Sequence, residues 1–235
     1  MWMSHLYLPL GPGFCSILVG FFVIVLILRS VHYAYESLGA SSNTAIFLLF
    51  ATLIGSIFSI PITELPPERV VSYHAVDFFG MRYAVPGVSH EKGTTLAVNV
   101  GGAIIPTLVS FYLLIKRELR AKALVGTAVV AFVIHWIADP VPGLGIAVPV
   151  FMPVVMTAIV ALTLSREEAP PLAYIAGSLG TLIGADLTNL DKVRDLGAPD
   201  ATIGGAGTFD GIFLTAILAV LLATSYMRPH AAHVG

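Results

Sequence analysis

Residues 93–115 read GTTLAVNVGGAIIPTLVSFYLLI and contain no charged residue, and residues 140–165 are equally free of charge. A transmembrane helix needs about 20 mostly apolar residues, so either stretch is long enough to cross a lipid bilayer. The rest of the chain has the same character, because 57% of its 235 residues are hydrophobic and only 11% are charged. A soluble domain is about 25% charged. The sequence therefore predicts an integral membrane protein.

Seven apolar stretches are bounded by charged or turn-forming residues. They cover residues 14–32, 43–62, 94–115, 121–138, 143–165, 172–190 and 209–226. The predicted fold is an all-α bundle of about seven transmembrane helices, and residues 1–235 are expected to form a single polytopic membrane domain. Residues 1–12 contain no Lys or Arg. The first stretch therefore lacks the basic region of a cleavable signal peptide and is expected to stay as a helix.

The distribution of basic residues predicts the orientation. Residues 116–122, between the third and fourth stretches, hold four of the 12 Lys and Arg residues. Short loops rich in Lys and Arg face the cytoplasm. We expect the protein in the cell membrane. With seven crossings, a cytoplasmic loop at residues 116–122 places the N-terminus outside and the C-terminus in the cytoplasm.

Two longer stretches are expected outside the bilayer. In residues 63–93, β-branched and aromatic residues at 70–76 and 81–86 flank Gly80, a pattern that predicts a β-hairpin between helices two and three. An aromatic segment lying at the membrane surface is the alternative. Residues 191–208 are rich in Gly, Pro and Asp and are expected to form an outer loop.

Composition also excludes several partners. The 12 basic residues are outnumbered by 14 acidic ones, which argues against nucleic acid as a partner. Cys15 is the only cysteine, and the chain has no His/Cys cluster with zinc-ligand spacing. We expect no metal and no cofactor. The lipid bilayer is the expected partner, with a transmembrane peptide or protein as a candidate substrate.

Polar residues within apolar stretches are the candidate functional residues, because a charge in hydrocarbon costs several kcal/mol. Asp186 lies near the end of the sixth stretch, with Asn189 close behind. Small residues every four positions, at Ala176, Gly180 and Gly184, predict a seam for a neighbouring helix. Asp186 is expected near this seam, although a solvated or backbone-bonded carboxylate is the alternative.

Asp210 opens the seventh stretch. It lies between Gly207 and Gly211, where glycine allows the backbone to approach a substrate closely. An acid in the first turn of a helix is also stabilised by the helix dipole, so a purely structural role as a cap is the alternative.

Three more polar residues complete the set. His135 and Asp139 are four residues apart, so they are predicted to share one helix face, where a hydrogen bond between them can form. A hydrogen bond from His135 to a neighbouring helix is the alternative. Asn99 lies beside Gly101 and Gly102 and is expected to join neighbouring helices by hydrogen bonds. Because helices four and six end, and helix seven begins, on the same side, Asp139, Asp186 and Asp210 are predicted to gather at one depth.

Two close carboxylates cannot both be ionised, so one can act as a base and the other as an acid. This is the chemistry of aspartic proteolysis. The run Gly207–Thr208–Phe209–Asp210 resembles the Gly-x-Gly-Asp motif of the presenilin and signal-peptide-peptidase class, with Phe209 in place of the second glycine. The resemblance implies that Asp186 and Asp210 form a catalytic pair that cleaves membrane-spanning substrates.

A second resemblance covers most of the chain. Gly-Ala-Asp-Leu at 184–187, Gly-Thr-Phe-Asp-Gly-Ile-Phe-Leu at 207–214 and Asn-Val-Gly-Gly-Ala at 99–103 resemble a family of uncharacterised multipass prokaryotic membrane proteins. This likeness singles out Asn99, Asp186 and Asp210 without implying a reaction. Three functions therefore stay open: an intramembrane aspartyl protease, a proton- or cation-coupled transporter or channel that uses the same acids, and a non-catalytic scaffold.

Overall fold

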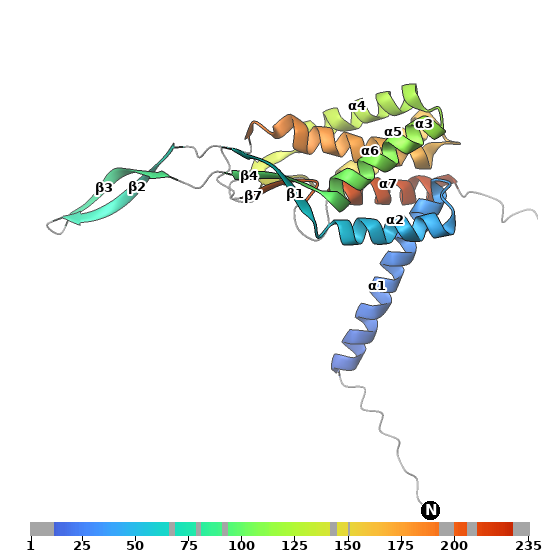
Figure 1. Ribbon diagram of the computed structural model, residues 1–235, viewed down its shortest axis with the longest axis horizontal. Coiled ribbons are helices and arrows are strands. Elements are labelled where there is room, and N and C mark those ends of the chain that lie inside the picture. Colours follow the sequence, from blue (N-terminus) through green and yellow to red (C-terminus); the bar gives the residue numbers. More distant parts are fainter. Residues whose placement is uncertain are drawn as a thin grey trace, which may run out of the picture.

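The computed structural model describes residues 12–65, 69–78, 81–90, 94–141, 145–149, 151–192, 200–205 and 211–227. Within these ranges the fold is mostly helical, with a small three-stranded sheet at one end of a helix bundle (Figure 1). The α-helices are α1 (Pro12–Ser37), α2 (Ser42–Gly55), α3 (Ile105–Lys116), α4 (Arg120–Ile137), α5 (Phe151–Leu164), α6 (Ala169–Thr181) and α7 (Gly211–Met227).

Helix α6 forms the centre of the bundle. All but one of its residues from Ala169 to Thr181 are buried, and it packs against α3, α4, α5 and α7. Small residues allow this close packing: a Cβ added at Gly177 would lie 3.0 Å from the backbone of Ala216 in α7. A Cβ at Gly180 would lie 2.6 Å from Val130 in α4. The predicted small-residue seam is therefore the contact between α4 and α6.

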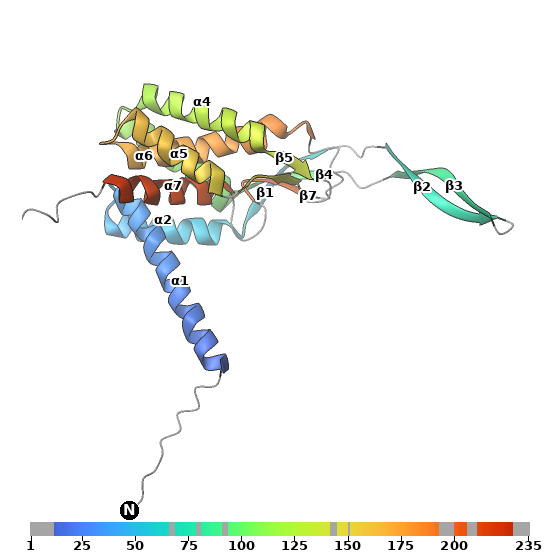
Figure 2. The same cartoon turned by 180° about the vertical axis from the view of Figure 1, so that it is seen from behind.

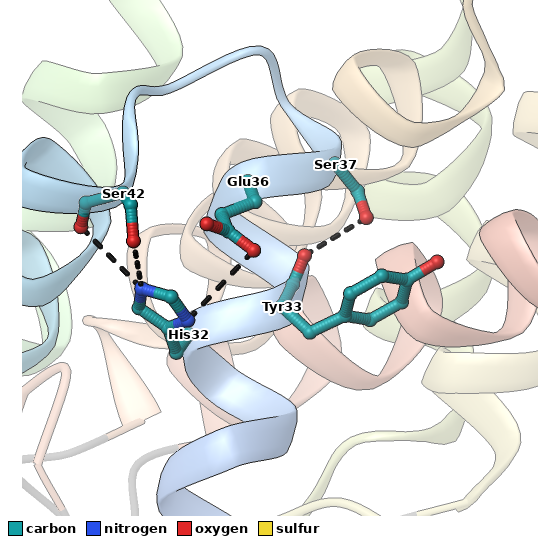
Figure 3. A network of polar contacts seen from close by, with 5 residues as sticks. All are labelled: His32, Tyr33, Glu36, Ser37 and Ser42. Atoms are coloured by element: carbon teal, nitrogen blue, oxygen red, sulfur yellow. Dashed lines mark hydrogen bonds and ion pairs between the residues drawn. The ribbon is translucent and has the colours of Figure 1, made fainter.

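Helix α1 leaves the bundle at an angle, as both views show (Figures 1 and 2). Only its C-terminal end packs against other helices, through Val31, Ala34 and Tyr35. The turn into α2 needs Gly39, whose φ is +84°. Beside this turn, His32 Nε2 lies 3.1 Å from Ser42 Oγ, and His32 Nδ1 lies 3.8 Å from Glu36 Oε2 (Figure 3).

Two helices are long and apolar enough to cross a membrane: α1 from Ser16 to Ser37, and α4. Helices α2, α5 and α7 are also apolar but shorter, as is the helical segment Val100–Lys116. Large apolar side chains are exposed on helices throughout the bundle, among them Phe21, Phe47, Phe111, Phe132 and Phe151. Exposed apolar surface on this scale is typical of a protein that is covered by lipid or by a partner.

The sheet is built from segments far apart in the sequence. Its strands are β1 (Ser59–Leu65), β4 (Thr94–Asn99) and β7 (Asp200–Ile203), in the order β1-β4-β7. Strand β4 is antiparallel to β1 and parallel to β7, with Val98 opposite Ile203. Because β4 and β7 are parallel, their carboxyl ends lie at the same edge, next to the helix bundle.

The predicted hairpin is confirmed. Strands β2 (Arg69–Phe78) and β3 (Met81–His90) pair antiparallel and extend away from the bundle beyond the sheet (Figure 1). A further pair, β5 (Asp139–Val141) and β6 (Gly145–Ala147), follows α4 and was not predicted.

Several predicted helix boundaries are wrong, because strands replace the ends of three apolar stretches. Residues 94–99 form β4, residues 59–62 belong to β1 and residues 145–147 form β6. These segments are short and rich in β-branched residues or interrupted by Gly or Pro. A short apolar run fits a buried strand as well as a helix. The predicted outer loop 191–208 likewise contains β7, which pairs with β4.

Candidate functional site

Two π-helical turns flank the candidate site. One, η1 (Val100–Ile104), joins β4 to α3, and the other, η2 (Leu182–Asp186), extends α6. A short 3-10 turn, η3 (Leu187–Asn189), follows η2. π-Turns are rare and occur often at functional sites, because an extra residue per turn redirects side chains and leaves carbonyls without helical partners.

Asp186 lies at the end of η2, beyond α6 and outside the two helices that are long enough to cross a membrane. Its Oδ2 accepts a hydrogen bond of 3.0 Å from the backbone N–H of Gly204, which directly follows β7. Burial raises the pKa of Asp186 from 3.8 to about 6, and the Gly204 N–H opposes this rise by favouring the charged form. The carboxyl group can therefore gain and lose a proton near neutral pH.

Gly204 is required at this position. Its φ of +72° lies in the left-handed region, and an added Cβ would lie 2.7 Å from the backbone nitrogen of Ala103 in η1. The end of β7 is thus pressed against η1 on one side, while Asp186 binds it from the other.

Asn99 lies against the same turn. An added Cβ at the next residue, Gly205, would lie 3.2 Å from the Cβ of Asn99. The Asn99 side chain is buried and uses both of its ends: Oδ1 accepts from the Gly102 N–H at 2.8 Å, and Nδ2 donates to Ser56 O at 2.8 Å and to Ser59 Oγ at 3.2 Å. Asn99 is the last residue of β4 and fixes η1 to the end of α2 and to the start of β1.

The carbonyls freed by the end of α6 are satisfied by side chains. Asn189 is fully buried, and its Nδ2 donates to Gly184 O and Ala185 O at 3.2 and 2.9 Å. Its Oδ1 accepts from Lys192 Nζ at 2.7 Å. Asn189 therefore caps the helix end that carries Asp186. Gly184 itself packs directly on Ala131 of α4, as its place in the small-residue seam predicts.

His135 has a different partner from the predicted one. Its Nδ1 lies 2.9 Å from Thr188 Oγ1, which in turn donates to Gly184 O at 2.9 Å. Helix α4 ends at Ile137, and the extended backbone at Ala138 takes Asp139 off the helix face. Asp139 is exposed on β5, and the described residues show no bond between it and His135. The predicted i, i+4 pair is therefore wrong.

The structure brings some of the predicted residues together. Asp186 and Asn99 contact the adjacent residues Gly204 and Gly205. Gly184 lies in η2 and Asn189 in η3, and His135 contacts η3 through Thr188. Gly207 and Asp210 lie outside the described residues. Gly211 begins α7, and the next residue, Ile212, packs in one hydrophobic cluster with Leu182 and Ile203. Gly204, Gly205, Thr188 and Lys192 were not among the predicted site residues, although a Gly-Gly pair after a β-branched run is typical of a tight backbone approach.

Among the residues that the structure describes, there is no group of three or more His, Cys, Asp or Glu side chains that could hold a metal ion.

Comparison with family models gives one match that covers most of the chain. The model for the proteins of unknown function designated DUF1614 matches residues 53–222. This range contains the sheet, both π-turns and the Asp186–Gly204 hydrogen bond. No curated protein and no solved structure matches the chain.

Proposed function

The chain belongs to the DUF1614 family, whose function is unknown, and we propose that it is a membrane-embedded aspartyl protease in which Asp186 and Asp210 exchange protons with the substrate. The observation that carries the proposal is the Asp186 carboxyl group, held against the Gly204 N–H at 3.0 Å in surroundings that raise its pKa to about 6. A general acid or base works best when its pKa is near the operating pH.

A membrane location is part of the proposal. Two apolar helices of spanning length and the exposed apolar side chains of the bundle support it. All seven helices would cross the bilayer, with the basic turn after α3 in the cytoplasm. The sheet would then lie on the outer side. Open sheet edges are not tolerated in hydrocarbon, so Asp186, which is tied to the end of β7, would lie at the boundary between lipid and water.

The pairing with Asp210 rests on chain connectivity. Asp210 directly precedes α7, whose Ile212 packs with Leu182 of η2 and Ile203 of β7. In the proposed reaction, the ionised carboxylate takes a proton from a water molecule, whose oxygen attacks the peptide carbonyl carbon. The protonated partner donates to the carbonyl oxygen. As the tetrahedral intermediate collapses, the C–N bond breaks, the first carboxyl group gives its proton to the leaving amine, and the second takes a proton from a hydroxyl of the intermediate, which restores the two protonation states.

An extended substrate fits this site because β7 is an edge strand. The sheet order leaves one side of β7 without a strand among the described residues, and β7 runs directly into Gly204. A free strand edge offers unpaired N–H and C=O groups that can bind an added strand. A peptide paired with β7 would therefore pass close to the Asp186 carboxylate.

The proposal is tested by cleavage of a transmembrane peptide by the purified chain in lipid vesicles. We expect Asp186→Asn and Asp210→Asn each to abolish cleavage, because neither amide can exchange a proton. Asp191→Asn is the matched control, since Asp191 is exposed two residues beyond the Asn189 cap, and this variant should cleave normally. Full activity in either Asp186→Asn or Asp210→Asn would rule out the pair.

A proton- or cation-coupled transporter is the second candidate. One observation favours it: the π-turn η2 interrupts the helix at Asp186. The only hydrogen-bond partner of the Asp186 carboxyl group among the described residues is the neutral N–H of Gly204. Broken helices beside a protonatable carboxylate are typical of transporters. A non-catalytic scaffold would also leave Asp186 bound to backbone, but it predicts neither cleavage nor ion flux.

A further inference from the structure

One face of α6 carries buried hydroxyl groups. Tyr174, Ser178 and Thr181 follow one another at i, i+4 and i+7, a spacing that places all three on the same side of a helix. All three are almost completely buried. We call these three residues the hydroxyl face. It is unusual for the central helix of an apolar bundle, because each buried hydroxyl requires a hydrogen-bond partner.

The π-turn continues this face to Asp186. In an uninterrupted α-helix the next position on the face would be residue 185, eleven residues after Tyr174. In η2 the N–H of Leu187 is shared between Ile183 O, four residues back, and Leu182 O, five residues back. The bond to Leu182 O closes a π-turn, which contains one residue more than an α-helical turn. The extra residue moves Asp186 into the place that Ala185 would otherwise take. The hydroxyl face therefore ends on the carboxylate.

Neighbouring helices direct further hydroxyls at α6. Tyr35 of α1 lies with its ring centroid 6.2 Å from that of Tyr174. Ser110 of α3 lies 2.6 Å from Ser178, oxygen to oxygen. Thr157 of α5 contacts α6 at Gly177, where an added Cβ would lie 3.3 Å from the threonine methyl group. Hydroxyl-bearing residues from three helices, α1, α3 and α5, thus lie against α6.

Two of these hydroxyls, those of Thr157 and Thr181, have no hydrogen-bond partner within the part of the chain that the structure describes, and both oxygens are buried. The buried Tyr35 hydroxyl interacts with the hydroxyls of Tyr174 and Thr52. Buried polar groups in folded proteins are nearly always hydrogen-bonded. Internal water is the usual partner where protein atoms do not serve, and each such water binds two to four polar groups.

We propose that the chain conducts protons along the hydroxyl face of α6, bridged by internal water, between the α1–α2 end of the bundle at Tyr35 and Asp186. Each hydroxyl accepts a proton on its oxygen while it passes its own proton onward, so none is consumed. The inference rests on the proton-exchanging role of Asp186 in the proposed function, and the transporter candidate shares that role. Polar groups that cross a membrane interior commonly form such relays.

Proton flux into lipid vesicles tests the path. The purified chain is reconstituted into vesicles of phosphatidylcholine and phosphatidylglycerol that contain a pH-sensitive dye. A membrane potential, imposed with a potassium gradient and valinomycin, drives protons inward. We expect Asp186→Asn to reduce the flux to that of empty vesicles. Thr181→Val and Tyr174→Phe should each slow it about tenfold, which corresponds to about 1.4 kcal/mol in the barrier.

Thr224→Val is the matched control, because Thr224 is a half-buried threonine on α7 and does not belong to the hydroxyl face of α6; its hydroxyl donates to Val220 O at 2.8 Å. This variant should conduct like the unsubstituted chain. Wild-type flux in both Thr181→Val and Tyr174→Phe would overturn the path, as would a flux in the unsubstituted chain no faster than in empty vesicles. If the chain cleaves the peptide but its proton flux does not depend on these hydroxyls, the proton path is refuted and the protease proposal is not. If the flux depends on the hydroxyls but no cleavage occurs, only the protease proposal is refuted.

Thermal unfolding of Thr181→Val gives a second, independent readout. If water bridges the Thr181 hydroxyl, its replacement by a methyl group removes hydrogen bonds, and we expect a lower Tm than in the unsubstituted chain. If the hydroxyl is buried dry, the same substitution relieves an unpaired polar group and raises Tm. A higher Tm would therefore contradict a hydrated path.

Discussion

The carboxylate of Asp186 accepts a hydrogen bond from the backbone N–H of Gly204 at 3.0 Å, across 18 residues of sequence. This bond joins the end of the central helix to the end of an edge strand. It also fixes the position of the carboxyl group whose pKa burial raises to about 6. The geometry at Asp186 therefore depends on a glycine.

Gly204→Ala is expected to lower the free energy of unfolding by about 2 kcal/mol, because a non-glycine residue at positive φ costs about 1–3 kcal/mol. The new methyl group would also collide with Ala103. Denaturant unfolding in detergent measures the change. Gly20→Ala is the control, since nothing lies within 4 Å of a Cβ added at Gly20. An equal effect of the two substitutions would contradict the account.

Stability should depend on pH through Asp186. Because burial raises its pKa from 3.8 to about 6, the folded chain holds the proton more tightly than the unfolded chain. The stabilisation is complete below about pH 4 and is lost as the pH rises to about 6, an effect of roughly 2 kcal/mol. Unfolding curves of the unsubstituted chain and of Asp186→Asn across this range measure it. Parallel pH profiles would show that Asp186 is not responsible.

Asn99→Ala should be strongly destabilising. It removes the hydrogen bond that caps η1 and two hydrogen bonds to the α2–β1 connection. Each is worth about 1 kcal/mol, so we expect the free energy of unfolding to fall by roughly 3 kcal/mol. Asn99→Asp keeps the acceptor for the Gly102 N–H and should lose less. The exposed Asn43 provides the control, Asn43→Ala. If Asn99→Asp proves as destabilising as Asn99→Ala, the cap contributes nothing.

The apolar stretches of the sequence predicted the existence of all seven described helices, because long uncharged runs between charged turns leave few alternatives. The hairpin β2–β3 was predicted as well, since β-branched and aromatic residues alternate around Gly80. Such elements are predictable because they depend on residues that are close in sequence and not on tertiary contacts.

The three-stranded sheet could not be predicted in this way. Strand β4 needs partners from β1 and from β7, and β7 lies about a hundred residues further along the chain. For the same reason the Gly204 partner of Asp186 and the Thr188 partner of His135 were missed. The pairing of His135 with Asp139 assumed a continuous helix, which the extended residue Ala138 interrupts.

The pair of carboxylates is tested most directly by titration of Asp186 itself. The chain is labelled with isotope-enriched aspartate and placed in lipid nanodiscs, and the carboxyl signal that Asp186→Asn removes is followed by NMR against pH. If Asp186 and Asp210 meet, their protons are lost in two coupled steps, and Asp210→Asn should reduce the Asp186 signal to a single step. An identical single step in the unsubstituted chain and in Asp210→Asn would show that the two acids do not interact.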